Sequence, residues 1–151
     1  MTLPAVFPLA MSQVANELGL SLPLNLLHPW VIALAGKSAA PVSFSNLLGK
    51  TGRYDGSNTV SSGPVYSISL NNPFFGGTLN GLSQQGSGNL TLGFSLAPNW
   101  NGSIKVINNS SGANAVLAKQ NSTTWFLAGA SGNILVSRAG NTDSFTILPS
   151  N

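Results

Sequence analysis

The pattern of apolar and polar residues changes along the chain near residue 63. Before this point, short apolar runs are broken by proline and glycine. After it, apolar and polar residues alternate, most clearly over residues 90–96, which read Leu-Thr-Leu-Gly-Phe-Ser-Leu. Because successive side chains of a β-strand point to opposite faces of a sheet, the pattern predicts a mainly β chain with short N-terminal helices.

Residues 64–151 are expected to form an antiparallel β domain. Strand-like runs separated by turn-forming residues lie at residues 65–70, 90–96, 104–106, 115–119, 123–128, 134–138 and 144–148. None of the intervals has room for the crossover helix that joins parallel strands. We therefore predict an antiparallel β-sandwich or jelly-roll-like domain of about eight strands.

Residues 1–50 predict a module of short helices. Two segments, residues 12–19 and 45–49, each begin with a serine that can cap a helix and end with a glycine that can adopt the left-handed conformation. Between them, Pro29 suits the first turn of a helix that stops at Gly36. Residues 51–63, rich in glycine and serine, are predicted to be a linker to the β domain.

The apolar residues of this module are expected to be buried by other subunits. Helices this short are not stable alone in water, and residues 30–35 are apolar on nearly every face. Such a helix is either the centre of a core or buried in a partner, and the module has few other residues to surround it. The candidate interface residues are Val14, Leu18, Trp30, Val31, Ile32, Leu34, Phe44, Leu47 and Leu48.

Charged residues make up only 6% of the chain, which is about a quarter of the usual share. A freely diffusing protein normally has a more charged surface, so this composition favours a subunit of an assembly. The net charge of +3 is carried by single, scattered lysine and arginine residues. Nucleic-acid binding depends on several simultaneous phosphate contacts, so we expect no nucleic-acid partner.

The chain offers few residues for catalysis or metal binding. It has no cysteine, one histidine, His28, and three acidic residues, Glu17, Asp55 and Asp143. His28 lies in an apolar stretch and is expected to be structural, and both aspartates lie close to turn residues. We therefore expect a protein that is not an enzyme and that holds no cofactor or metal. No apolar run has the length of a membrane span, so no membrane association is expected.

One aromatic residue is a candidate for recognising a carbohydrate. Trp100 lies in the turn-rich segment Pro98-Asn99-Trp100-Asn101-Gly102. An indole ring exposed on such a turn can stack against a sugar. A host-surface glycan is therefore an alternative partner, with the β domain as the recognition module.

Three separated segments of the first fifty residues occur in a characteristic order. They read Ser12-Gln13-Val14-Ala15-Asn16-Glu17-Leu18-Gly19, then Leu34-Ala35-Gly36, then Val42-Ser43-Phe44-Ser45-Asn46-Leu47-Leu48-Gly49-Lys50. In these segments the chain resembles a leader module at the start of many tailed-bacteriophage virion proteins. That module reads roughly I-S-L-S-Q-V-N-x-E-L-G, then L-A-G, then I-S-M-S-x-L-x-G-K-S. The resemblance covers about the first third of the chain.

The resemblance implies a structural protein of the virion. We expect the N-terminal module to dock into the tail, baseplate or fibre base, and the β domain to be displayed outward. Other virion proteins would then be its partners. A capsid decoration or cement protein is the alternative placement. In either case the expected localisation is the virion, and the expected state is a homo-oligomer, with a trimer favoured.

Overall fold

The computed structural model describes residues 2–151. These residues contain eight strands joined in one antiparallel sheet. The strands are β1 (Tyr54–Thr59), β2 (Tyr66–Phe74), β3 (Gly77–Gln84), β4 (Leu90–Leu96), β5 (Ser103–Asn108), β6 (Asn114–Asn121), β7 (Thr124–Leu127) and β8 (Thr142–Ser150). Their order in the sheet is β1-β8-β5-β6-β7-β4-β3-β2. The prediction of a mainly β, antiparallel fold is confirmed.

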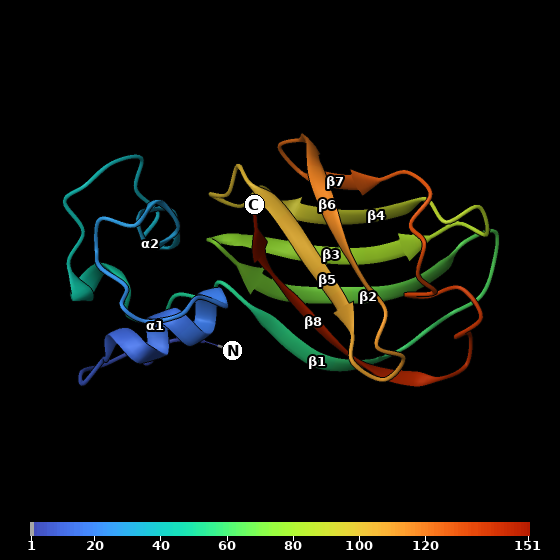
Figure 1. Cartoon of the computed structure of the whole chain (residues 1–151), viewed down its shortest axis with the longest axis horizontal. Coiled ribbons are helices and arrows are strands. Elements are labelled where there is room, and N and C mark those ends of the chain that lie inside the picture. The colour runs from blue at the N-terminus through green and yellow to red at the C-terminus, as the bar shows by residue number, and fades with distance from the viewer. Residues whose placement is uncertain (1) are drawn as a thin grey trace.

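The sheet curls until its two edge strands approach each other. Ser61, just after β1, forms an isolated antiparallel bridge with Ser67 of β2. Asn58 of β1 donates a hydrogen bond from Nδ2 to the carbonyl oxygen of Ser69 in β2 at 3.2 Å. In Figure 1, β5 and β8 cross in front of β2 and β3. The result is a two-layered, nearly closed sheet that is broadly sandwich-like.

The alternation seen in the sequence determines which side chains enter the core. In β4, Leu90, Leu92 and Phe94 are buried, whereas Thr91 and Gly93 between them are half-buried. Each buried leucine contributes about 1.5–3 kcal/mol relative to an exposed one. The strands therefore derive much of their stability from one shared layer of side chains between the two halves of the sheet.

Two short helices and a 3-10 turn form the N-terminal module. They are α1 (Met11–Leu18), α2 (Pro29–Leu34) and η1 (Phe44–Asn46). Gly19 ends α1 in the left-handed conformation, with φ 67°, as predicted. His28 caps α2, because its Nδ1 accepts a hydrogen bond from the backbone N–H of Trp30 at 3.2 Å. No helix among residues 2–151 is long and apolar enough to cross a membrane.

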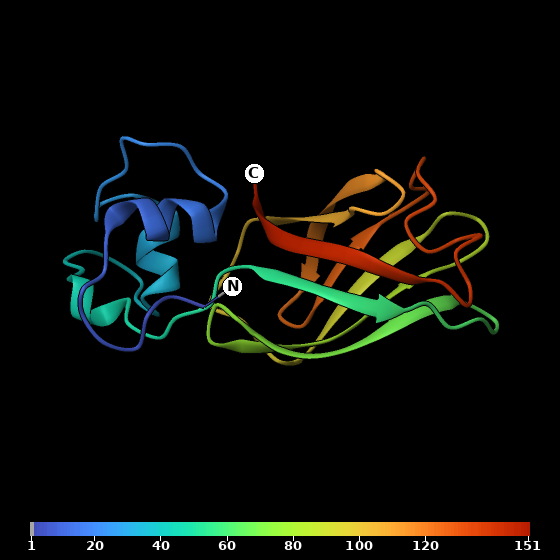
Figure 2. The same cartoon turned by 90° about the horizontal axis from the view of Figure 1, so that it is seen from below.

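The module packs against one end of the curled sheet. Figure 2 shows the helices gathered at one end of the strands. A Cβ atom added to Gly52 would lie 3.1 Å from Leu34, 3.2 Å from Leu18 and 3.2 Å from Phe75, which follows β2. Side chains from α1, α2 and the sheet therefore meet at Gly52. The buried apolar residues of the module and the sheet form one continuous core.

The predicted linker of residues 51–63 is wrong in part, because β1 runs through it. Tyr54 of β1 pairs with Ile147 of β8, and Thr59 pairs with Thr142. Of the six residues of β1, only Tyr54 is large and apolar, so the pattern gives little sign of a strand. The strand is formed by its hydrogen bonds to β8 rather than by the burial of its own side chains.

The predicted strand at residues 134–138 is also wrong, because this segment is an irregular loop. Ile134 and Leu135 are nevertheless completely buried. The Gln84 Oε1 atom accepts hydrogen bonds from the backbone N–H groups of Leu135 at 2.9 Å and Val136 at 3.1 Å. A side chain thus satisfies the backbone groups that a neighbouring strand would otherwise pair.

Candidate functional site

Most of the predicted interface residues are buried within the chain itself. Five of the nine have at most 1% of their surface exposed: Val14, Leu18, Val31, Leu34 and Leu47. They cannot contact another subunit, so their assignment to an intersubunit interface is wrong. The physical reason is that they belong to the core that the chain's own module and sheet form together, which the sequence pattern did not reveal.

The other four predicted interface residues are half-buried: Trp30, Ile32, Phe44 and Leu48. Trp30 packs edge-on against Trp100, with 5.3 Å between ring centroids and 87° between ring planes. Ile32 lines a pocket that Trp30 also lines. These two side chains of α2 therefore face the β4–β5 loop, and each keeps part of its surface accessible.

The strongly exposed apolar side chains of the module lie in its loops and not on α2. Val6 and Phe7 precede α1, and Leu22 and Leu27 lie between α1 and α2. Their exposed fractions range from 56% for Leu22 to 72% for Val6. We call these four residues the apolar loop residues. In the sequence each of them lies within two residues of a proline, in a segment without the periodicity of a helix or strand.

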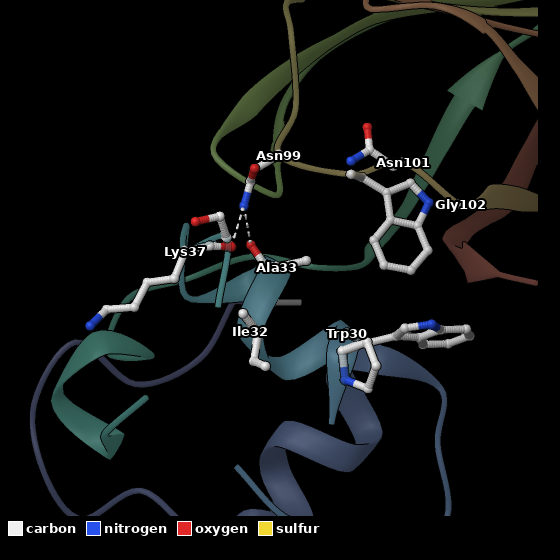
Figure 3. Close-up of a pocket in the computed structure, with 10 residues that line it drawn as sticks. Trp30, Ile32, Ala33, Lys37, Asn99, Asn101 and Gly102 are labelled. Atoms are coloured by element: carbon white, nitrogen blue, oxygen red, sulfur yellow. Dashed lines mark hydrogen bonds between the residues drawn. The ribbon is translucent and has the colours of Figure 1, made fainter. Parts of the chain in front are cut away.

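A pocket of about 460 Å³ lies between α2 and the loop that joins β4 to β5. Figure 3 shows Ile32 and Ala33 on the α2 side of this space, and Asn99 and Asn101 on the loop side. Its volume falls in the range of small-molecule sites, about 300–1,000 Å³. Its lining combines aromatic and aliphatic side chains with two amides, a combination that suits an amphipathic ligand.

The expectation that Trp100 is an exposed platform is wrong. Only 4% of its surface is exposed. Its ring lies 4.8 Å from that of Phe75, and its Nε1 donates a hydrogen bond to the carbonyl oxygen of Ser103 at 2.8 Å. Trp100 thus anchors the loop to the core, and half-buried Trp30 offers the more accessible indole in the same pocket.

The two asparagines of the pocket are held in defined orientations. The Asn99 Nδ2 group donates to the carbonyl oxygens of Ala33 at 3.0 Å and Lys37 at 3.4 Å. Carbonyl oxygens only accept, so the Nδ2 side of the amide must face them. Asn101 is held through its Oδ1, which accepts from the Lys119 ammonium at 2.7 Å. Asn99 therefore presents its Oδ1 acceptor, and Asn101 its Nδ2 donors, away from these partners.

Both lysine ammonium groups near the pocket are engaged elsewhere. The Lys37 Nζ group donates to the carbonyl oxygen of Pro41 at 3.1 Å. The Lys119 Nζ group bonds Asn101 and the carbonyl oxygen of Trp100, and it lies 5.3 Å from the centre of the Trp125 ring. None of the acidic residues lines the pocket. A hydrogen bond to a neutral oxygen leaves an ammonium group charged, so the pocket lining carries the positive charge of Lys37 and no negative charge.

The acidic residues are separated in the fold and do not form a catalytic pair. Asp55 pairs with Thr146 and Asn58 pairs with Asp143 in the β1–β8 ladder. Because Asp55 and Asn58 are three residues apart on one strand, Asp55 and Asp143 lie on opposite faces of the sheet. Asp143 is buried, whereas Asp55 is exposed.

Each aspartate is held by a neighbouring arginine. Hydrogen bonds from Arg138, at 2.7 and 2.6 Å, lower the pKa of Asp143, and a further bond from Asn108 acts in the same direction. Burial acts to raise the pKa of Asp55, but hydrogen bonds from Arg53 and Thr146 lower it overall. Both groups are therefore charged structural residues at neutral pH.

Glu17 joins the helical module to the start of β1. Its Oε1 atom accepts hydrogen bonds from the backbone N–H groups of Gly52 at 2.8 Å and Arg53 at 3.0 Å. Burial raises the pKa of this carboxyl group. Residues 2–151 contain no group of three or more histidine, cysteine or acidic side chains close enough to hold a metal ion. Through its two hydrogen bonds, Glu17 links α1 to the residues just before β1.

The chain was compared with models of known protein families, with curated proteins and with solved structures, and it matches none of them.

Proposed function

We propose that this chain is a non-enzymatic structural subunit of a tailed-phage virion. Its N-terminal module attaches to the tail, baseplate or fibre base, and its β domain is displayed outward. The resemblance of three leader segments to virion proteins supports the particle assignment. The low proportion of charged residues agrees with a subunit whose surface is largely covered in an assembly.

The observation that carries the proposal is the exposure of the apolar loop residues on the module. Fully burying a large apolar side chain contributes about 1.5–3 kcal/mol. Several such residues at one end of the chain supply the contact that a particle subunit needs. Val31 and Leu34 are already buried in the chain's own core, so attachment uses the loops that flank α1 rather than the inner face of α2.

Substitution of Leu27 by aspartate tests the attachment. Leu27 is 70% exposed, so Leu27→Asp leaves the fold intact but places a carboxylate in the proposed contact, where burial of an unpaired charge is costly. We expect loss of the chain from purified particles. The matched control is Val116→Asp on β6, since Val116 is also exposed and lies on the β domain.

The experiment measures the copies of each variant per particle by quantitative mass spectrometry of separated heads and tails. Incorporation of Leu27→Asp at the wild-type level would refute attachment through this loop. Recovery of the wild-type chain with heads would support the alternative, a capsid decoration or cement protein. The preference for a homotrimer stays a prediction.

A further inference from the structure

We propose that the pocket between α2 and the β4–β5 loop is a binding site for a saccharide without a basic group. This inference concerns a ligand site on the purified chain and does not depend on attachment to a particle. It rests on three features of the pocket: a half-buried indole, two oriented amides, and a lining that includes a lysine and no carboxylate.

The apolar wall of the pocket suits the hydrophobic face of a sugar ring. Trp30 is half-buried and packs edge-on against Trp100, which holds its indole in place. Ile32 and Ala33 extend the wall along α2. The face of an indole carries a partial negative charge that attracts the C–H groups of a sugar.

The polar side of the pocket suits sugar hydroxyl groups. A hydroxyl both donates and accepts hydrogen bonds, so adjacent hydroxyls are best recognised by one acceptor and one donor. Asn99 and Asn101 both line the pocket, and Figure 3 shows the two side chains on its loop side. Asn99 can offer its Oδ1 and Asn101 its Nδ2 to a ligand. Their other amide atoms are already bonded to Ala33, Lys37 and Lys119. The pair is therefore oriented before any ligand arrives, which reduces the entropic cost of binding.

The charges around the pocket disfavour a basic sugar. Lys37 lines the pocket and keeps its positive charge, although its ammonium group donates to the neutral carbonyl oxygen of Pro41. Glu17, Asp55 and Asp143 all lie outside the pocket lining. A basic sugar therefore finds no carboxylate partner there.

Saturation-transfer NMR on the full chain tests the proposal. The probes are the methyl glycosides of glucose, galactose, mannose and N-acetylglucosamine, with methyl glucosaminide as the basic comparison. A small, open pocket predicts dissociation constants of about 1 mM. We expect transfer to at least one of the four neutral glycosides and weaker or no transfer to methyl glucosaminide.

Three variants locate the binding. Trp30→Ala removes the stacking surface and is expected to abolish transfer. Asn101→Ala removes one hydrogen-bonding group without touching the core, and about a two- to tenfold weaker affinity is expected. The matched control is Asn114→Ala, because Asn114 is exposed and pairs with Ile107, toward the far end of β5 from the pocket.

Several results would overturn the proposal. These are no transfer to any of the four neutral glycosides, transfer to methyl glucosaminide alone, or equal binding by Asn101→Ala and the wild type. Asn101→Ala keeps the test valid if Trp30→Ala does not fold. Particle incorporation is measured separately, so a negative result here leaves the structural role untouched, and a failed incorporation test leaves this one untouched.

Discussion

Replacing Leu34 by alanine tests whether the N-terminal module and the sheet share one core. Leu34 is 1% exposed and lies beside Leu18 and Phe75 around Gly52. The change removes three buried carbon atoms, worth together about 2 kcal/mol of transfer free energy. The cavity left behind adds to this, so we expect a total loss of about 3 kcal/mol. For a chain of this size, that corresponds to a fall in Tm of about 6–12 °C.

Urea unfolding followed by tryptophan fluorescence measures this loss. The matched control is Leu27→Ala, since Leu27 is 70% exposed and its truncation should change stability by less than about 0.5 kcal/mol. Because the core is continuous, the wild type should unfold in a single transition. If Leu34→Ala and Leu27→Ala were equally stable, or if the module unfolded well before the sheet, the shared core would be refuted.

Two further substitutions test the sheet. Asp143→Asn should lower the urea midpoint at pH 7. The folded pKa of Asp143 is lowered, so its contribution is present above its unfolded pKa of about 3.9 and disappears as the pH falls through the folded value; equal midpoints of variant and wild type at pH 7 would contradict this. Gly77→Ala should destabilise the chain by about 1–3 kcal/mol, since the new Cβ would lie 2.5 Å from the Leu96 oxygen and 2.6 Å from the Pro98 nitrogen. Gly86→Ala, with nothing within 4 Å, is its control, and a difference of less than about 0.5 kcal/mol between the two variants would refute the close packing at Gly77.

The parts of the fold that follow a strong local pattern could be predicted from the sequence. The strict alternation of β4 and the glycine that ends α1 each reflect a local rule, period-two burial in one case and a left-handed cap in the other. The strand β1 could not be predicted, because pairing with β8 and not its own apolar content forms it. Long-range pairing of this kind leaves no periodic trace in the strand itself.

The sequence indicates which types of residue form the candidate sites, but it does not show which of these residues are buried and which are accessible. The sequence pointed to Trp100 as the exposed aromatic residue, whereas burial against Phe75 leaves Trp30 as the accessible ring. The sequence indicates an excess of apolar residues in the module, but it does not show that the chain's own core buries most of them. The missing information was the position of the sheet end relative to α1 and α2, which depends on contacts between residues far apart in the chain.

The contacts at the junction also bear on how a particle subunit would display its β domain. Glu17 ties α1 to the start of β1, and Asn99 ties the β4–β5 loop to the end of α2. Together with the shared core around Gly52, these bonds join the module to the sheet at several separate points. A module attached to a particle through its loops would therefore hold the β domain in a fixed direction. The saccharide pocket, built from both parts, would keep the same orientation because neither wall can move without breaking these ties.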